Sequence, residues 1–485
     1  MSKVLENLEP KSVFSFFEDL TQIPRCSGNE KKISDYLVEF AKKRSLEVIQ
    51  DKALNVIIKK PGTKGYENAP TVILQGHMDM VCEKNKDTDH DFSFEPLKLR
   101  IEDDMIKATG TTLGADNGIA VAYALAILDS DEIPHPPLEV LITAEEETGM
   151  GGANNLDHDN LKGKILINID SEEEGTLLVS CAGGIRNIIS IPIEWDNPSG
   201  DLLTYELRIR GLKGGHSGME INKERGNSNI ILGRILQGIS INNDLYLAKI
   251  SGGAKMNAIP RESDATLLVN SKDKTKIEEE IREWNKIIGN ELKTADSDFR
   301  IEFEQSNGKY EKTFSKETMR KLLVALTLIP NGVQTMSVEI EGLVQSSTNL
   351  GVLTTTEESV LLECAIRSSV KTLKLDIVRK MGVLANLIGA NSESEGDYPA
   401  WEYRKDSYIR EVFVDCYKKI YGKGPIITAI HAGLECGLFD EKFDDLDMIS
   451  LGPNMYDVHT PNEHVSISST KRVWEYILKV LKSIK

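Results

Sequence analysis

Apolar residues along this chain form short runs and amphipathic stretches that alternate, and the two patterns predict different elements. Apolar positions that recur every three to four residues predict a helix, and a short continuous apolar run predicts a buried strand. On this basis the first 190 residues are expected to contain helices at 11–21, 30–44 and from 119 onward, and strands at 54–59, 72–75, 137–143 and 164–169.

Strands that alternate with helices predict an α/β fold with a mainly parallel sheet. The pattern changes near residues 195–200, where Pro198 and Gly200 indicate a linker. Beyond it, the order of elements suggests antiparallel pairing and an α+β sandwich: strands at 204–210, 245–251, 264–270 and 299–305, helices at 227–239, 275–293, 315–328 and 372–389, and a strand pair ending near 367.

A second boundary is expected at 391–399, a stretch rich in Ser, Glu and Gly. The chain then returns to a helix at 407–421 and an apolar strand at 448–451, which resembles the strands of the first part. We therefore expect one domain to be inserted into another: a first domain of residues 1–190 and 396–485, and an inserted domain of residues 191–395.

The length of 485 residues exceeds what one hydrophobic core usually holds, which also favours two domains. The chain is 40% hydrophobic and 28% charged, as expected of a soluble globular protein. With 58 Lys and Arg against 76 Asp and Glu, its net charge is −18. That charge disfavours nucleic acid and anionic membranes as partners.

The six cysteines are widely scattered and form no Cys-x-x-Cys pair, which predicts thiols in a reducing compartment rather than disulfides. The N-terminal residues Met1–Glu6 lack the apolar core of a signal peptide. The longest apolar helix candidate, Ile119–Leu128, is too short to cross a bilayer. A cytoplasmic, enzyme-sized protein is therefore expected.

Chemically useful side chains stand directly after three of the apolar runs. They are His77, the adjacent pair Glu146 and Glu147, and Asp170. In a parallel sheet these positions meet beyond the carboxyl ends of the strands, where ligands bind. Asp79 lies two residues after His77, so its carboxylate is placed to accept the second ring proton of a metal-bound imidazole.

Asp116 in a Gly-rich turn and His459 near the C-terminus complete a set of two histidines and three carboxylates that suits a pair of zinc-type ions. Asp116 is the best bridging candidate, because a carboxylate can place one oxygen on each of two ions. The expected chemistry is attack by a bridging hydroxide, with Glu146, adjacent to the ligand Glu147, as general base. Two plainer interpretations are that Asp116 caps the following helix and that Glu145–Glu147 is a solvated acidic run.

Four motifs resemble those of the di-zinc dipeptidase, aminoacylase and carboxypeptidase superfamily: Gly76–Asp79, Leu113–Gly118, Glu146–Gly149 and Asn168–Gly175. Three more are similar to its dipeptidase branch: Gly211–Gly218, Asn257–Glu262 and His431–Gly437. The resemblance extends from the first helices to the last one. It implies a zinc-peptidase catalytic domain with an inserted lid domain.

The resemblance implies how the ligands are shared between two Zn²⁺ ions. One ion would be held by His77 and Asp170, and the other by Glu147 and His459. Asp116 would bridge both ions, and Co²⁺ or Mn²⁺ could replace Zn²⁺ at the same ligands.

The resemblance also implies roles outside the ligand set. Asp79 would orient His77, Glu146 would be the general base, and the Asp116–Asn117 peptide bond would be cis. In the inserted domain, substrate would be bound by His216 at the scissile carbonyl, by Arg367 at the substrate carboxylate and by Asn257 through a hydrogen bond. The plainer interpretations are a structural role for His216 and a surface ion pair for Arg367.

One motif departs from the superfamily. Relatives carry a Gly near the last histidine, whereas this run reads Tyr456–Glu463, and His464 competes for the ligand role five residues after His459. His459 is preferred because it directly follows the strand and turn. His431 and Glu435 lie in a motif of the dipeptidase branch, and their roles are left open between substrate contact and support of the site.

These residues and the resemblance predict a metal-dependent hydrolase of unblocked dipeptides of broad specificity, including Xaa-His. One competing hypothesis is an N-acyl-amino-acid amidohydrolase or an aminopeptidase of the same superfamily, because the metal ligands are shared. Another is a non-catalytic metal-binding protein, against which the presence of both Glu146 and Asp79 argues. The sequence does not fix the preferred dipeptide, the physiological metal or whether the chain forms a homodimer.

Overall fold

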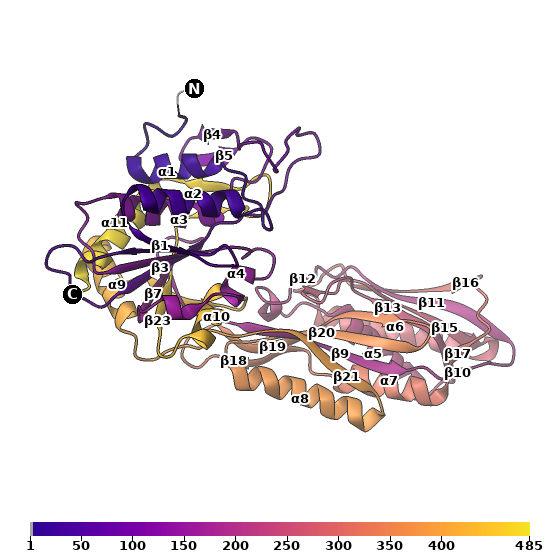
Figure 1. Cartoon of the computed structure of the whole chain (residues 1–485). Coiled ribbons are helices and arrows are strands. Elements are labelled where there is room, and N and C mark those ends of the chain that lie inside the picture. Colours follow the sequence, from indigo (N-terminus) through magenta and orange to yellow (C-terminus); the bar gives the residue numbers. More distant parts are fainter. Residues whose placement is uncertain (1–2) are drawn as a thin grey trace. The chain divides into compact units, whose positions relative to one another are not determined.

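The computed structural model describes residues 3–485, which divide into two compact units (Figure 1). The first unit contains the chain up to Ser180 together with Tyr403–Ala429 and Leu434–Lys485, and the second contains Cys181–Glu402 with Ile430–Gly433. The first division falls before the expected boundary at residue 190. The reason is that β9 (Gly183–Pro192) pairs along its whole length with β20 (Ser359–Ser368) of the second unit.

An eight-stranded sheet forms the centre of the first unit. Its order is β1 (Glu47–Gln50), β2 (Val56–Lys60), β6 (Leu138–Thr143), β3 (Val72–His77), β7 (Ile165–Asn168), β23 (Asp447–Ser450), β8 (Thr176–Cys181) and β22 (Ile426–Ile430). Strands β6, β3, β7 and β23 are mutually parallel, whereas β1, β2 and β6 pair antiparallel. The predicted α/β fold is confirmed, with its parallel pairing in the middle of the sheet.

The parallel strands are built from continuous apolar runs because both of their faces are covered. All residues of β3, β6 and β7 are buried, as is typical of parallel sheets. Register pairs His77 with Thr143 and Gln75 with Asn168, so the carboxyl ends of these strands lie level at one edge. The loops that follow these ends therefore meet.

Seven helices accompany this sheet in the described part of the first unit: α1 (Lys11–Thr21), α2 (Lys31–Lys43), α3 (Ala115–Asp129), α4 (Gly151–Asn154), α9 (Tyr408–Tyr421), α10 (Glu435–Lys442) and α11 (Ile467–Ser483). Helix α3 packs against β3 and α1, and every residue from Asn117 to Leu128 is buried. Its apolar character on all sides is that of a core helix. None of the helices in residues 3–485 is both long and apolar enough to cross a membrane.

A small four-stranded sheet joins two distant parts of the first unit. Its order is β24 (Met455–Tyr456), β25 (His464–Ser466), β5 (Met105–Ala108) and β4 (Leu99–Glu102). Pairing of β25 with β5 brings the segment after His459 next to the strand that precedes the Gly-rich turn. The sequence pattern did not predict β4 and β5, which are only four residues long each.

The second unit is an α+β structure, as predicted. Its main sheet has the order β16 (Arg300–Ser306), β11 (Leu202–Arg210), β15 (Ser263–Asn270), β13 (Leu245–Gly252), β19 (Val344–Thr355), β20, β9 and β21 (Asn391–Tyr398), and β18 (Gly332–Met336) also pairs with β19. Four helices pack against it and share one apolar core: α5 (Ser228–Ser240), α6 (Lys274–Glu291), α7 (Lys316–Leu328) and α8 (Lys371–Ile388).

The stretch 391–399, where a second domain boundary was expected, lies just before the division of the chain after Glu402. Most of this stretch forms β21, an edge strand that pairs with β9. Its Ser, Glu and Gly residues are compatible with a strand because most of them are exposed at a sheet edge. The linker expected at 195–200 likewise contains a short strand, β10 (Trp195–Asp196), which pairs with β17 (Thr313–Phe314).

The prediction that all six cysteines are thiols is wrong. Cys26 and Cys82 form a disulfide with Cα atoms 5.6 Å apart, and the other four cysteines are buried. Spacing could not indicate this pair, because it depends on the loop after α1 lying beside the loop after β3. An isolated parallel β-bridge between Cys26 and Met80 joins these two loops.

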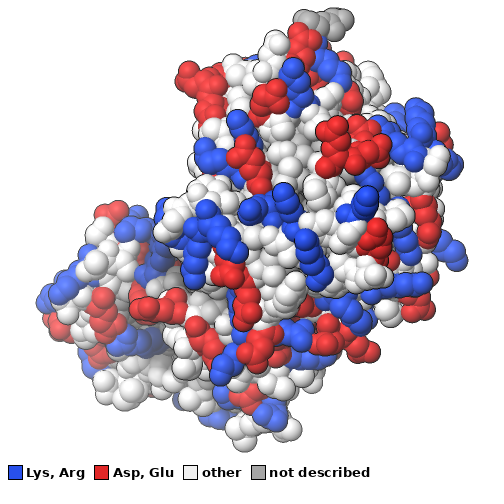
Figure 2. Space-filling view, turned by 90° about the vertical axis from the view of Figure 1, so that its left-hand side faces the viewer, with Lys and Arg blue, Asp and Glu red and all other residues white. Residues whose placement is uncertain are grey.

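The excess of acidic residues does not collect into a single patch on the surface shown in Figure 2, where basic and acidic side chains are interspersed. Many of these charges form exposed ion pairs, such as Arg234 with Glu291 at 2.7 Å and Arg320 with Glu317 at 2.7 Å. Exposed pairs of this kind contribute little to stability. Both signs reach solvent because the chain has 58 Lys and Arg beside its 76 Asp and Glu.

Candidate metal centre

The loops after four parallel strands bring the predicted site residues of the first unit together. His77 ends β3, and Glu146 and Glu147 follow β6. Asp170 follows β7, and His459 lies beyond β23. The level carboxyl ends of these strands therefore place the side chains at one edge of the sheet, as expected for an α/β ligand site.

Asp116 lies between the two histidines. Its Oδ1 atom is 3.1 Å from Nε2 of His77, and its Oδ2 atom is 3.2 Å from Nε2 of His459. Each imidazole also has a second carboxylate nearby. Nε2 of His77 is 3.5 Å from Oδ1 of Asp170, and Nε2 of His459 is 3.0 Å from Oε1 of Glu147. The geometry therefore has two halves, each with one imidazole and one carboxylate of its own, joined by Asp116.

Asp79 occupies the other side of His77. Its Oδ1 atom lies 3.3 Å from Nδ1 of His77 and accepts the backbone N–H of Glu146 at 3.0 Å. Its Oδ2 atom accepts the backbone N–H of Glu147 at 3.2 Å and the hydroxyl of Ser27 at 2.8 Å. Asp79 therefore connects His77 to the loop that carries the two glutamates. Ser27 was not predicted, because its partner is 52 residues away along the chain.

Three overlapping groups of side chains could hold a metal ion within the described residues. They are His77 with Asp116 and Asp170, His77 with Glu146 and Glu147, and Asp116 with Glu147 and His459. The ligand atoms of each group lie within 4.8 Å of one another. Most of these side chains are largely buried, with side-chain exposures of 1% for His77, 13% for Asp116 and 8% for Asp170.

Burial and crowding raise the pKa values of two carboxyl groups in the cluster. Burial, together with the charges of Asp116 and Glu147, raises the pKa of Asp170 to about 6, although His77 opposes the shift. Burial and neighbouring carboxylates raise the pKa of Glu146 well above its ordinary value. Mutual repulsion of this kind is relieved by a cation, whose charge dominates such a site.

The same carboxylates raise the pKa of an imidazole, because their negative charge favours the protonated ring. Hydrogen bonds to Asp116 and Glu147 raise the pKa of His459 to about 11. Burial alone would raise the pKa of Asp116, but its hydrogen bonds with His459 and His77 outweigh burial and lower that pKa. In the protein without metal, these shifts favour a protonated His459 beside an ionised Asp116.

The plainer interpretations of this cluster do not describe its geometry. Helix α3 has Gly114 at its N-cap and no side-chain cap, so Asp116 is not a capping residue. Of the acidic run, Glu145 is exposed, whereas Glu147 has a side-chain exposure of only 7%. The Asp116–Asn117 peptide bond is cis.

His464, the competing candidate, lies apart from the groups that could hold a metal. Its Nδ1 atom is 2.8 Å from the carbonyl of Asn462, and its ring stacks on Tyr456 with centroids 5.1 Å apart. His459 adopts a φ of +63°, which is uncommon for a residue other than glycine and often marks functional sites.

Glu435 is a buried carboxylate that contacts two of the strands that carry the cluster. Its Oε2 atom accepts hydrogen bonds from Gln75 at 2.6 Å and Thr143 at 2.8 Å, and Gln75 in turn accepts one from Asn168 at 2.5 Å. Burial raises the pKa of Glu435 to about 8. Its charge also acts on Glu146 and raises the pKa of that residue. Glu435 therefore connects β3 and β6 through Gln75 and Thr143 and acts on the site through its effect on Glu146.

We expect Glu435→Gln to change how stability of the metal-free protein depends on pH. Between the ordinary pKa of 4.5 and the folded value of about 8, the folded protein binds a proton at Glu435 that the unfolded chain releases. This linkage lowers the free energy of unfolding as pH rises through that window. The measurement is denaturant unfolding with chelator present. The free energy of unfolding of Glu435→Gln, relative to that of the unchanged protein, should rise between pH 5 and pH 8. Parallel pH profiles for the two proteins would contradict this.

The three predicted residues of the second unit are also brought close to one another. His216 lies in β12 (Gly215–His216), which pairs with β14 (Ala258–Ile259), and Asn257 directly precedes β14. The backbone carbonyl of Asn257 accepts the N–H of Ser217 at 2.9 Å. Burial and the charge of Arg367 lower the pKa of His216.

Arg367 is not part of a plain surface ion pair. It is half-buried in β20, and its Nη1 atom donates to the hydroxyl of Tyr398 at 3.0 Å. Nearby, His431 is 6% exposed and its Nε2 atom is 2.7 Å from the hydroxyl of Ser347. Burial, with the charges of Arg367 and His216, lowers the pKa of His431 to about 3. The second unit thus holds a polar cluster with one permanent positive charge.

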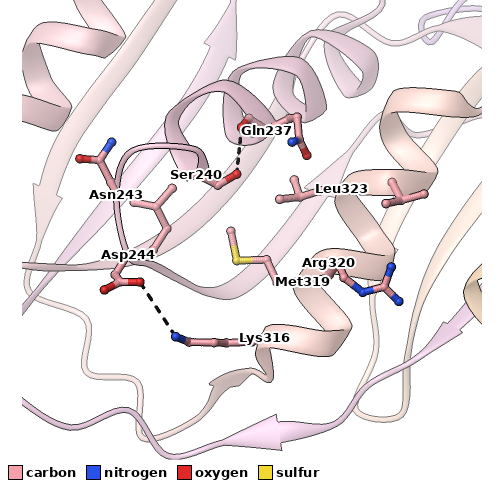
Figure 3. Close-up of a pocket in the computed structure, with 10 residues that line it drawn as sticks. Gln237, Ser240, Asn243, Asp244, Lys316, Met319, Arg320 and Leu323 are labelled. Atoms are coloured by element: carbon pink, nitrogen blue, oxygen red, sulfur yellow. Dashed lines mark hydrogen bonds and ion pairs between the residues drawn. The ribbon is translucent and has the colours of Figure 1, made fainter.

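A separate pocket of about 310 Å³ lies between α5 and α7 of the second unit (Figure 3). Its wall combines aliphatic side chains with Lys316 and Asp244, which are 4.0 Å apart. None of the predicted site residues lines it. The chemistry that the sequence predicts therefore belongs to the strand-end cluster rather than to this pocket.

Residues 73–483 match the model of Peptidase family M20/M25/M40. The chain therefore belongs to this peptidase family. The match extends over both units, in agreement with a motif resemblance that runs from the first helices to the last.

Two relatives with about 40% identity match almost the whole chain. The cytosol non-specific dipeptidase of Escherichia coli (strain K12) is 39% identical over 482 residues, which are 99% of each chain. The crystal structure of aminoacylhistidine dipeptidase from Vibrio alginolyticus is 40% identical, with a TM-score of 0.95 over 99% of this chain and 98% of that one. The aminopeptidase PepT of Bacillus cereus, at 16% identity and a TM-score of 0.57 over 98% and 99% of the chains, shares the fold.

Proposed function

We propose that this chain is a di-zinc dipeptidase that hydrolyses unblocked dipeptides of broad side-chain type, including Xaa-His, in the cytoplasm. The observation that carries the proposal is the position of Asp116, whose two oxygens face two different histidines at 3.1 and 3.2 Å. A carboxylate in that arrangement can bridge two cations, as in two-metal hydrolases. Dipeptidases with 39% and 40% identity over nearly the full chain support the same substrate class.

The donor set fits zinc-type ions because it combines two imidazoles with carboxylates in largely buried positions. We assign His77 and Asp170 to one ion and Glu147 and His459 to the other, with Asp116 shared between them. Co²⁺ and Mn²⁺ suit the same donors. When bound, the ions supply Lewis acidity, which polarises a carbonyl and lowers the pKa of water.

The chain's own groups then orient the site and move protons. Asp79 holds Nδ1 of His77 and, through two backbone N–H groups, the loop of Glu146 and Glu147. A carboxylate behind a ligating histidine fixes its tautomer and ring orientation. Burial raises the pKa of Glu146, which suits a general base that takes a proton from attacking water and passes it to the leaving amine.

Recognition of the substrate is assigned to the second unit. The backbone N–H groups of Gly218 and Met219 point at Nδ1 of His216 at 3.3 and 3.1 Å, so the proton of the neutral imidazole is on Nε2. That N–H can donate to a developing oxyanion. Arg367 is proposed to pair with the substrate carboxylate, and Asn257, which is exposed, to hydrogen-bond the substrate.

A substrate panel tests this proposal. An unblocked Xaa-His dipeptide, the same dipeptide with an acetylated amine, and the tripeptide extended at its C-terminus would be compared by kcat/KM with metal present. We expect the unblocked dipeptide to be hydrolysed far faster than the other two. Hydrolysis of the acetylated form alone would overturn the dipeptidase proposal and indicate an N-acyl-amino-acid amidohydrolase.

A further inference from the structure

Glu463 is a buried carboxylate that the proposed mechanism does not use. It lies four residues after His459 and is 3% exposed. Its Oε2 atom accepts the backbone N–H groups of Leu113 at 2.7 Å and Gly114 at 2.9 Å. Its Oε1 atom accepts those of Ala115 at 2.7 Å and Asp116 at 3.4 Å. One side chain thus holds four consecutive N–H groups, the last of which belongs to Asp116.

Arg25 binds the same turn as a hydrogen-bond donor. It is 2% exposed and donates to the carbonyls of Met78 and Asp79, each at 3.0 Å, and to the carbonyl of Gly114. The loop after β3 and the Gly-rich turn are therefore joined through one guanidinium. Burial lowers the pKa of Arg25, and the charge of Glu463 opposes that shift.

From these contacts we infer that Glu463 is a positioning residue for the metal centre, an inference that rests on the proposed function. Asp116 can serve both halves of the site only if its carboxylate stays between His77 and His459. Glu463 fixes the backbone of Asp116. It also belongs to the same short segment as His459, where its own N–H donates to the carbonyl of Thr460 at 3.0 Å. It therefore couples the bridging residue of one loop to the histidine of another. Charge-assisted hydrogen bonds to backbone N–H groups are among the strong ones.

A purely structural role would have a different signature. Helix α3 has no side-chain cap of its own, so Glu463 also satisfies N–H groups at the start of that helix. If capping were its whole role, substitution would lower the stability of the metal-free protein and leave the metal affinity of the folded molecules unchanged. Metal affinity therefore separates positioning from capping.

The test uses the full-length protein after its metal has been removed with a chelator. Its Mn²⁺ affinity is measured by calorimetric titration, and its stability is measured separately by thermal unfolding. Glu463→Gln keeps the size of the side chain but loses one anionic oxygen. We expect its Mn²⁺ affinity to fall roughly 10- to 100-fold, the usual cost of losing a group that orients a ligand. Glu463→Asp, which keeps the charge but cannot reach as far, should give a smaller loss, and it carries the test if Glu463→Gln does not fold.

Glu139→Gln is the matched control. Glu139 is 4% exposed and accepts the backbone N–H groups of Lys162 and Gly163 at 2.8 and 2.9 Å, near the amino end of β6 and away from the strand-end cluster. Its metal affinity should equal that of the unchanged protein. Unchanged affinity in both Glu463 variants, or an equal loss in Glu139→Gln, would overturn the inference. Absence of Mn²⁺ binding by the unchanged protein would instead overturn the proposed function.

Discussion

Glu146→Gln is expected to lower kcat for an Xaa-His dipeptide by roughly 10²- to 10⁴-fold, the usual contribution of a general acid–base group. The variant should still bind as much metal as the unchanged protein. Glutamine has nearly the same shape and keeps the backbone N–H that Asp79 accepts at 3.0 Å, so the loop should hold its position. What it cannot do is accept a proton from water and deliver it to the leaving amine. Steady-state kinetics beside metal analysis would measure both quantities.

The neighbouring glutamate provides the control for this variant. Glu145 precedes Glu146 in the same acidic run, but its side chain is exposed. Glu145→Gln removes the same charge from the same loop and should leave kcat within a few-fold of the unchanged value. A loss of metal in Glu146→Gln would show that Glu146 is a ligand instead, in line with its place in one of the groups that could hold an ion.

Asp116→Ala is expected to have the largest effect on metal binding. Loss of this side chain removes a donor from both halves of the site, because its oxygens face His77 and His459 separately. Affinity for the ions should fall by more than the roughly 10- to 100-fold that loss of a supporting group costs. Hydrolysis should disappear at metal concentrations that saturate the unchanged protein. Equilibrium dialysis with Zn²⁺ or Mn²⁺, followed by an activity assay, measures both effects.

Asp159→Asn is a suitable control for that experiment, since the side chain of Asp159 is 90% exposed in the same unit. Its metal content and activity should match those of the unchanged protein. If Asp116→Ala retained two ions per chain, Asp116 would not bridge them, and the division of ligands between two ions would have to be redrawn.

The sequence predicted the elements of the fold wherever apolar runs were long. The strands ending at His77, Thr143 and Asn168 and the buried helix α3 follow directly from local composition, since a run buried on both faces must be apolar throughout. The edge strand β21 carries mostly polar residues, and the edge strand β4 has only four residues, so neither gave such a signal. Their pairing depends on neighbours that are distant in sequence.

The candidate site shows the same limit. Its metal-competent residues could be predicted because each one follows an apolar strand or lies in a recognisable motif. The groups that hold them in place could not, because their contacts are remote: Glu463 reaches Leu113 across 350 residues, and Arg25 reaches Gly114 across 89. The disulfide between Cys26 and Cys82 was missed for the same reason. A glutamate four residues after His459 was visible, but nothing in the spacing connected it to the Gly-rich turn.

The central claim is that one cluster at the strand ends binds two ions and that these ions are needed for dipeptide hydrolysis. The most direct test is the metal content of the purified protein, measured beside hydrolysis of an Xaa-His dipeptide before and after chelation. We predict close to two ions per chain, loss of hydrolysis on chelation, and recovery with Zn²⁺, Co²⁺ or Mn²⁺. Full hydrolysis by protein that has been stripped of metal would contradict the account.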